Sequence, residues 1–394
     1  MKILHIANDF CHTKVHLNLF KMLDEKGVEQ IIYNPVRDKS HIGRNSFKGN
    51  HTRIVYSYVV KPFHKYFYHI KRRTVFKDLV KQIDVREINL SHASTLFTDG
   101  GLAYKLYKKY HIPYVVAVRN TDVNGFLELL PNTWIAGLKI LLHAERIFFI
   151  SESLKKKFEN HFVIRLILNK IKHKFVLMPN GIDSYFLDHI SHEICCENKV
   201  IYVGDFSENK NVVRLAKVVL RLRQEPGFED TVLTIVGGGK NKTNEVEQII
   251  TSNPEAFNYV GKVYDKQKLC EILRSNSVFA MPSIHETFGL VYLEALSQNL
   301  PVLYTKGQGI DGLFAPTIGL GVNPLSENEI YLALKQLLSQ RKVFSNNDVN
   351  FEDFRWADIA DKYIAHYKEC LGMCDVNRTL LGNFKKWGGN YYIL

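Results

Sequence analysis

Two glutamates, Glu286 and Glu294, lie eight positions apart in the segment 281–295 and could act together on one ligand. A strand-like run at 278–282 leads into this segment, and apolar residues at helical spacing over 289–298 lead out of it. The backbone N–H groups of a helix start are unpaired and attract an anion. One carboxylate precedes the expected helix, and the other lies in its second turn. The pattern therefore predicts a site for a ligand that carries both hydroxyl and phosphate groups.

The whole string is more specific than the two glutamates, which at this spacing are ordinary surface residues in many proteins. It resembles the E-x7-E segment of the family-4 retaining glycosyltransferases, the glycosyl transferases group 1, which have the GT-B fold. By that resemblance Glu286 meets the donor sugar and Glu294 binds the ribose of the nucleotide. The resemblance also implies that the backbone of Phe288, Gly289 and Leu290 approaches the sugar and the phosphate.

A second stretch, 202–211, resembles the loop in which an Arg and a Lys of this family clamp the donor diphosphate. Lys210 matches the family's lysine, and Gly204 matches its glycine. Asp205 stands where the family has Arg, and a carboxylate aimed at a diphosphate would repel it. Either Asp205 turns away from the donor, or another cation such as Lys240 substitutes. Without the resemblance, a solvated lysine at a helix start is a competing explanation of Lys210.

Two glycine-rich loops follow expected strands. The loop 236–240 is not an ATP-type phosphate loop, because Thr234 occupies the position that would require glycine. The loop 307–312 spells G-x-G-x-x-G, but residues 314–316 interrupt the helix that a dinucleotide site needs. The resemblance instead places Gly238 near the nucleotide and Gly309 beside the donor phosphates.

The N-terminal half matches the family more loosely. Many members carry a histidine after the strand that corresponds to 114–118, but here the strand runs into 119–122 without one. We expect Asn120 and Asp122 to contact sugar hydroxyls there. The family's Gly-Gly loop after the first strand is also missing. Residues on the acceptor side are therefore predicted around the loop that replaces it and at the end of a later strand: Asp9, Thr13, Lys14 and His92.

Strand-like and helix-like runs alternate along the chain, which predicts parallel sheets covered by helices. The expected strands are 2–7, 29–33, 114–118, 146–150, 175–178, 199–203, 231–236, 257–260, 278–282 and 301–304. The expected helices are 15–26, 211–223, 243–251, 266–275, 289–298 and 326–340. We interpret this α/β pattern as a GT-B architecture, two Rossmann-like domains that face each other across a central cleft. The expected divisions are an acceptor domain at 1–187, a donor domain at 188–355, and a helix and tail at 356–394 that return to the first domain.

The composition limits the classes of protein to which the chain can belong. Its 394 residues are 46% hydrophobic, and no apolar run is long enough to cross a membrane. The start at 1–8 resembles a buried strand rather than a signal peptide, so we expect a cytoplasmic protein. The six cysteines follow neither a disulfide nor a zinc pattern, and no Asp-x-Asp sequence occurs. We therefore expect no metal and no cofactor beyond a nucleotide sugar as donor substrate.

Positive charge is concentrated in the N-terminal half. Residues 1–190 carry 30 Lys and Arg against 16 Asp and Glu, and the remainder carries 22 against 24. Such asymmetry is typical of a surface for an anionic partner. Residues 61–73 mix aromatic and basic side chains, which predicts either a segment that lies on an anionic membrane or an ordinary basic helix with a buried aromatic face. No nucleic-acid-binding motif is present, so we do not expect nucleic acid as the partner.

The resemblance implies transfer of a sugar, with retention and without a metal, from a nucleotide diphosphate sugar to a hydroxyl acceptor. A glycan or lipid-linked acceptor in cell-surface polysaccharide assembly (capsule, O-antigen, lipopolysaccharide or exopolysaccharide) fits the basic half, with the protein peripheral on the inner face of the membrane. Two alternatives share the fold. One is a sugar-nucleotide epimerase, and the other is a non-catalytic partner that binds a sugar nucleotide.

Overall fold

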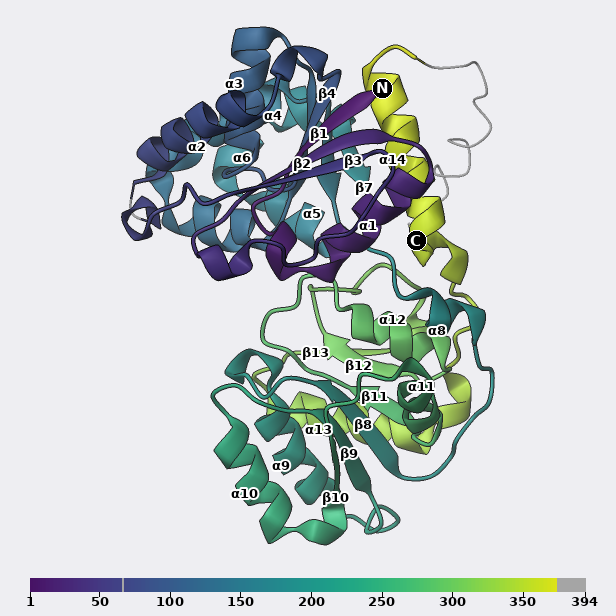
Figure 1. The fold of residues 1–394 in the computed structure, drawn as a ribbon. Helices are drawn as coiled ribbons and strands as arrows, with labels where there is room; N and C mark the ends of the chain where they lie inside the picture. The colour runs from purple at the N-terminus through teal and green to yellow at the C-terminus, as the bar shows by residue number, and fades with distance from the viewer. Residues whose placement is uncertain (66, 374–394) are drawn as a thin grey trace.

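The computed structural model describes residues 1–65 and 67–373, which form two parallel sheets with helices on both faces (Figure 1). The first sheet has the order β3-β2-β1-β4-β5-β6-β7, and the second has the order β10-β9-β8-β11-β12-β13. Every pairing in both sheets is parallel. The expected pair of Rossmann-like domains is therefore confirmed.

The strands of the first sheet are β1 (Lys2–Ile6), β2 (Glu29–Pro35), β3 (Thr52–Ser57), β4 (Leu90–Ala93), β5 (Tyr114–Val118), β6 (Arg146–Phe149) and β7 (Phe175–Leu177). Those of the second sheet are β8 (Lys199–Gly204), β9 (Val232–Gly237), β10 (Phe257–Gly261), β11 (Val278–Ala280), β12 (Val302–Thr305) and β13 (Gly319–Val322). The α-helices before the second sheet are α1 (Lys14–Glu25), α2 (Tyr68–Gln82), α3 (Gly100–Tyr110), α4 (Trp134–His143), α5 (Glu152–Asn160), α6 (Phe162–Arg165), α7 (Leu168–Ile171) and α8 (Ser184–Asp188). The later ones are α9 (Val212–Leu222), α10 (Thr243–Ser252), α11 (Lys266–Arg274), α12 (Leu290–Ser297), α13 (Glu327–Ser339) and α14 (Trp356–Cys370).

All ten expected strands and all six expected helices are present, with ends that differ by at most two residues. Three observed strands were not among the expected ones: β3, β4 and β13. The edge strand β13 has two glycines in four residues, and glycine is depleted in strands, so its sequence gives little strand signal. None of the described helices is long and apolar enough to span a membrane.

The chain crosses between the domains twice, and the two crossings lie side by side. Ile182 donates its backbone N–H to the carbonyl of Phe354 at 3.0 Å. A Cβ on Gly181 would lie 2.7 Å from the indole of Trp356, so only glycine allows this approach. The predicted boundary at 187/188 falls inside α8, which packs on α11 and α12. The first domain therefore ends before Ser184.

Helix α14 returns to the first domain and packs along α1 (Figure 1). Tyr367 of α14 is fully buried and hydrogen-bonds to His92, while Lys26 of α1 pairs with Asp361 at 2.8 Å. The tail that we expected to return with it, 374–394, lies outside the described residues.

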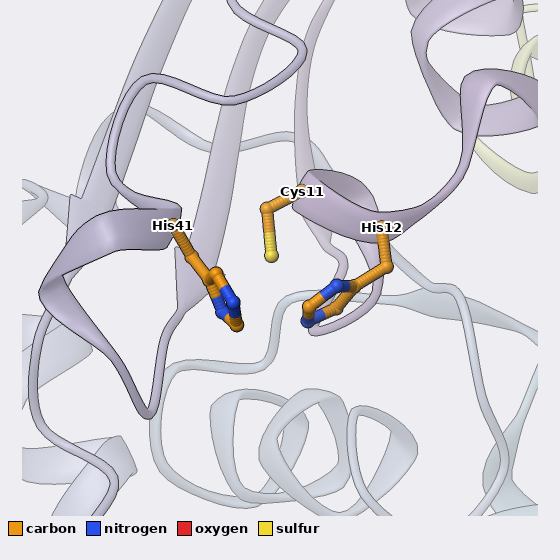
Figure 2. A group of neighbouring side chains, drawn as sticks. All are labelled: Cys11, His12 and His41. Atoms are coloured by element: carbon orange, nitrogen blue, oxygen red, sulfur yellow. The ribbon is translucent and has the colours of Figure 1, made fainter.

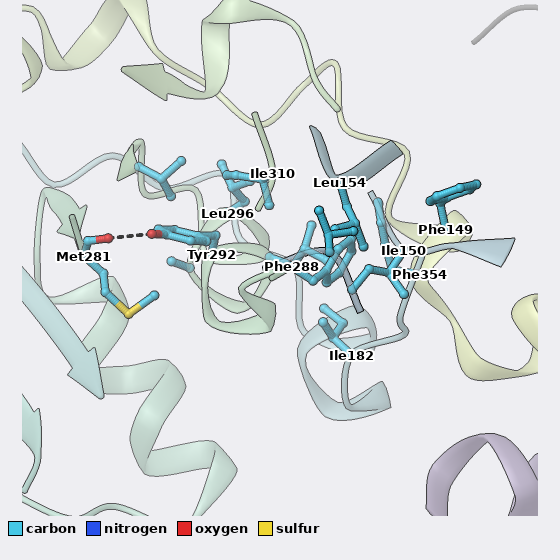
Figure 3. Close-up of a cluster of buried hydrophobic side chains, with 14 of the residues drawn as sticks. Phe149, Ile150, Leu154, Ile182, Met281, Phe288, Tyr292, Leu296, Ile310 and Phe354 are labelled. Carbon is cyan, nitrogen blue, oxygen red and sulfur yellow. Dashed lines mark hydrogen bonds between the residues drawn. The ribbon is translucent and has the colours of Figure 1, made fainter. Parts of the chain in front are cut away.

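A cluster of buried apolar side chains joins the two domains (Figure 3). Ile150 and Leu154 come from the first domain, Phe288 and Ile310 from the second, and Phe354 from the crossing segment. Each of these side chains is at most 6% exposed. The domains thus share one continuous apolar core at this point, which fixes how the two sheets face each other.

Among the described residues of the first domain four histidines are buried, and three of them lie in its core: His5 on β1, His16 on α1 and His92 on β4. Burial lowers the pKa of His5 and of His16 to about 3, and it lowers the pKa of His92 well below 6.5. Both ring nitrogens of His5 lack a hydrogen-bond partner among the described residues. These histidines are therefore neutral in the folded protein at neutral pH and gain a proton on unfolding in acid.

We predict that acid destabilises the fold through these histidines, and that His5→Leu reduces the effect. Between the unfolded pKa near 6.5 and the folded pKa near 3, the unfolded chain binds more protons, so the free energy of unfolding falls as the pH falls. Removing one such histidine should lower this slope by about 1.4 kcal/mol per pH unit. Urea titrations at pH 7 and pH 5 measure it. The exposed His173→Leu is the control, and an equal reduction in both variants would contradict the assignment.

Candidate functional site

The loop that carries Glu286 is held by the loop 205–211 that follows β8. Asn209 accepts a hydrogen bond from the backbone N–H of His285 at 3.0 Å and donates to the carbonyl of the same residue at 2.9 Å. Asn211, in the left-handed region with φ 61°, donates to the carbonyls of Pro282 and Pro324. These bonds fix the backbone on either side of Glu286.

Glu286 and Lys210 form an ion pair, with Lys210 Nζ 2.7 Å from Glu286 Oε2. The Glu286 side chain is 11% exposed and that of Lys210 is 25% exposed, so the pair is screened from bulk water but open on one side. The other oxygen, Oε1, accepts from the backbone N–H of Thr287 at 3.1 Å. The backbone N–H of Glu286 itself donates to Gln308 at 2.7 Å. The structure thus brings together two residues predicted to act on the donor.

Two predicted glycines pack directly against this pair. Gly289 is the N-cap of α12 with φ +78°, and a Cβ there would lie 2.4 Å from the ring of Tyr292. Gly309 has φ +55°, and its Cβ would lie 3.1 Å from Glu286 Cγ and from the carbonyl of Phe288. Phe288 is a core residue, so only its backbone can face a ligand. Leu290 begins α12.

The first domain faces this loop directly. Asn120, just after β5, lies 3.5 Å from Thr287 Oγ1 through its Nδ2 atom. Ser151 and Ser153, from the start of α5, approach the carbonyls of Thr287 and Gly309 at 3.5 and 3.3 Å. Glu286 and Asn120 line one pocket of about 200 Å³, which draws its walls from both domains. A ligand held by Glu286 would therefore meet Asn120.

Glu294 lies on α12 away from that pocket's lining, near α11 and the start of α8. Burial raises the pKa of its carboxyl, which the nearby Lys266 opposes and Asp183 reinforces. In the part of the chain that the structure describes, no side chain hydrogen-bonds to this carboxylate. Its oxygens remain available to accept from ligand hydroxyls.

The ends of β8 and β9 bring the predicted Gly204 against Gly237, the neighbour of the predicted Gly238. A Cβ on Gly237, with φ +136°, would lie 1.8 Å from the carbonyl oxygen of Gly204, so the two strand ends touch. Gly238 is buried beside the hydroxyl of Tyr259. The Asp205 carboxylate accepts from the backbone N–H of Ser207 at 3.0 Å, so it is used within its own turn. Lys240 is exposed and outside the Glu286 pocket.

Two predicted site residues are corrected by the structure. Asp122 is fully buried and accepts from the backbone N–H groups of Leu96, Phe97 and Arg119, so it holds two loops together and cannot reach a sugar. His92 is 2% exposed and its Nδ1 lies 2.7 Å from the Tyr367 hydroxyl, so it belongs to the core under α14 and not to the acceptor side. His92 lies near the end of β4 and Asp122 follows β5, and the sequence cannot show that their side chains turn inward.

The other predicted acceptor residues lie in the loop after β1. Thr13 caps α1 by accepting from the backbone N–H of Val15 at 3.2 Å. Lys14 is exposed and Asp9 is half-buried. This loop lies at the carboxyl edge of the first sheet, the edge from which Asn120 faces the second domain.

Sequence reasoning did not single out Lys306, Thr287 or Gln308, which all line the Glu286 pocket. Lys306 is an exposed cation directly after β12. Its position directly after a strand and before the 307–312 loop could have identified it as a site residue from the sequence. Gln308 fixes the loop by donating to the carbonyl of Ile284 at 2.8 Å.

Residues 192–350 match the family described as glycosyl transferases group 1. The second domain is a group 1 glycosyltransferase domain. Its core strands and the loops that carry Lys210, Glu286 and Gly309 all fall inside the matched range.

Relatives and solved structures extend the likeness to the rest of the chain. Sulfoquinovosyl transferase SQD2 of Arabidopsis thaliana is 29% identical over 36% of this chain, which spans 27% of that protein's length. The putative teichuronic acid biosynthesis glycosyltransferase TuaC of Bacillus subtilis is 23% identical over 66% of this chain and 65% of its own. A sucrose-phosphate synthase from Thermosynechococcus elongatus aligns with 95% of this chain and all of its own, at 17% identity and a TM-score of 0.72. The last likeness confirms the GT-B fold.

We predict that Gly289→Ala damages the glycosyltransferase domain both in stability and in ligand binding. Alanine would have to keep the positive φ of this position, which is unfavourable, and its Cβ would collide with Tyr292. Together these effects should lower the free energy of unfolding by at least about 1 kcal/mol. Thermal unfolding measures the loss. Gly125→Ala, where a Cβ meets nothing within 4 Å, is the matched control. Equal melting temperatures for the two variants would show that the tight turn at Gly289 is not required.

Proposed function

We propose that this chain transfers a sugar, with retention and without a metal on the donor phosphates, from a nucleotide diphosphate sugar to a hydroxyl acceptor. The observation that carries the proposal is the Lys210–Glu286 ion pair, whose glutamate lines a pocket together with Asn120 of the facing domain and with Lys306. The residues needed for a donor sugar are a carboxylate for its hydroxyls, a cation for its phosphates and a polar wall opposite. All three kinds meet in this pocket.

In this proposal the leaving diphosphate takes the proton of the acceptor hydroxyl while the site stabilises the developing negative charge. Glu286 accepts hydrogen bonds from the sugar, and Lys210 turns toward the phosphates when the donor binds. Glu294 accepts from the ribose hydroxyls. Asn120 takes the place of the family's histidine and donates to the sugar from the other side.

In this proposal Lys306 supplies the second positive charge, which is missing at residue 205 because Asp205 stands where the family has Arg. It lines the pocket with Glu286, whereas Lys240 does not, so Lys306 is the better substitute. A diphosphate in a half-closed cleft needs compensating cations, and charge-assisted hydrogen bonds to phosphate are the strong ones. Lys157, which also lines the pocket, is already paired with Glu128 at 2.9 Å.

We predict that Lys306→Met and Lys210→Met each weaken binding of the donor by about tenfold to a hundredfold, because a hydrogen bond to a charged group contributes about 1.5–3 kcal/mol. A thermal-shift screen over UDP, GDP and ADP sugars first identifies the donor, and titration calorimetry then gives its Kd. Lys268→Met, on the exposed face of α11, is the control.

A flat screen across all nucleotide sugars would contradict the donor site altogether. Glu286→Gln separates the alternatives, since it should abolish transfer while leaving nucleotide binding intact. If the protein isomerises the donor sugar with no acceptor present, the epimerase function replaces the transferase. If Glu286→Gln leaves the glycan output of cells unchanged, a non-catalytic binding partner is favoured.

For the acceptor we propose an anionic or lipid-linked glycan of cell-surface polysaccharide assembly, presented at the inner face of a membrane. The excess positive charge lies in the domain that faces the donor site. In the segment 61–73, Phe63, Phe67 and Ile70 are each about half exposed. Exposed aromatic side chains among lysines and arginines suit an anionic lipid surface.

We predict that Phe63→Ser, Phe67→Ser and Ile70→Ser together lower binding to phosphatidylglycerol-containing vesicles by at least about tenfold, because apolar burial contributes about 25 cal/mol per Å². Cosedimentation measures the bound fraction. Leu325→Ser, Tyr264→Ser and Val343→Ser change three exposed apolar residues of the other domain and are the control. Equal binding by both triple variants would place the membrane surface elsewhere or exclude it.

A further inference from the structure

The loops that follow β1 and β2 bring three metal-binding side chains together. Cys11 and His12 lie on the 3₁₀ turn Phe10–His12, and His41 ends the 3₁₀ turn Lys39–His41. β1 and β2 are neighbouring parallel strands, so the loops after them meet at one edge of the sheet. Figure 2 shows the Cys11 sulfur between the two imidazoles, with all three side chains pointing into the same space.

The three side chains are close enough to share one ion. Each offers one ligand atom, and all three atoms lie within 4.8 Å of one another. The two rings are 4.6 Å apart between centroids and nearly perpendicular, at 85°. Tetrahedral zinc has bonds of about 2.0–2.3 Å, which place its ligand atoms roughly 3.3–3.7 Å apart. Small rotations of the side chains of His12, which is exposed, and His41, which is half-buried, would shorten the distances between ligand atoms to the range that zinc requires.

The backbone that carries these ligands is held in place without using the ligands themselves. Asn45 donates from Nδ2 to the carbonyl of Phe10 at 2.7 Å and to that of Thr13 at 3.2 Å, so it ties one loop to the other. Asp38 caps the second turn by accepting from the backbone N–H of Ser40 at 2.8 Å. Among residues 1–65 and 67–373, no side chain hydrogen-bonds to either imidazole. Ligation would therefore break no hydrogen bond of these rings.

We propose that Cys11, His12 and His41 bind one divalent transition-metal ion, with Zn²⁺ as the expected species. A thiolate and two imidazoles form a ligand set that favours zinc and disfavours magnesium or calcium. Three protein ligands leave one tetrahedral position open for water or for an oxygen of a ligand. The site lies in the loop predicted to face the acceptor, apart from the donor pocket, so the ion would order that loop and offer an acceptor oxygen a place to bind.

The test uses the full chain after removal of metal with a chelator, titrated with Co²⁺ alone. We expect one Co²⁺ per chain, visible bands of a tetrahedral site and a thiolate charge-transfer band, all displaced by Zn²⁺. Cys11→Ser should abolish the charge-transfer band. His12→Asn and His41→Asn should each weaken binding at least tenfold, since loss of even an outer partner of a ligand costs about 10–100-fold.

Cys196→Ser and His173→Asn are matched controls, because both residues are exposed and remote in sequence from the site, and they should bind Co²⁺ as the wild type does. Circular dichroism of each metal-free variant shows that it is folded. The proposal is overturned if the wild-type chain takes up no stoichiometric Co²⁺. It is equally overturned if Cys11→Ser, His12→Asn and His41→Asn combined leave the affinity unchanged. Neither result bears on the donor site.

Discussion

The ion pair between Lys210 and Glu286 is the interaction around which the proposed donor site is arranged. It joins the loop after β8 to the loop after β11, and β8 and β11 are neighbours in the sheet. Asn209 reinforces the junction by binding both backbone groups of His285. A buried charge is costly unless it is paired, so each member of the pair keeps the other in place. In the reaction that we propose, a donor diphosphate would offer Lys210 a new partner and would free Glu286 to bind the sugar.

Next to Glu286, the facing domain contributes hydrogen-bonding side chains. Asn120 and Ser151 approach the hydroxyl and the carbonyl of Thr287, next to Glu286, and Ser153 approaches the carbonyl of Gly309. Asp122, two residues after Asn120, accepts hydrogen bonds from three backbone N–H groups. Burial raises its pKa to about 6, and those hydrogen bonds oppose the rise. Its task is to hold the turn after β5 so that Asn120 projects into the cleft.

Much of this architecture can be predicted from sequence because parallel sheets leave a strong periodic signal. The strands of the second domain are short apolar runs, and the helices between them are amphipathic, so their order and their ends are visible in the residues. The residues of the donor wall follow from position, since they lie at strand ends. Side-chain direction is not visible in the same way. His92 and Asp122 have the right types at the right places, yet both turn into the core. The sequence does not reveal that His41 lies near Cys11 and His12, for a different reason. About thirty residues separate them along the chain, and only the pairing of β1 with β2 brings them together.

The apolar cluster of Ile150, Leu154, Phe288, Ile310 and Phe354 has a thermal consequence. Swinging the domains apart would expose these side chains to water, and the hydrophobic effect that opposes this weakens on cooling. The closed arrangement is therefore favoured by warmth over the ordinary range and loosens in the cold. Any movement that separates the two domains here would therefore carry a heat-capacity change set by these few buried rings and aliphatic side chains.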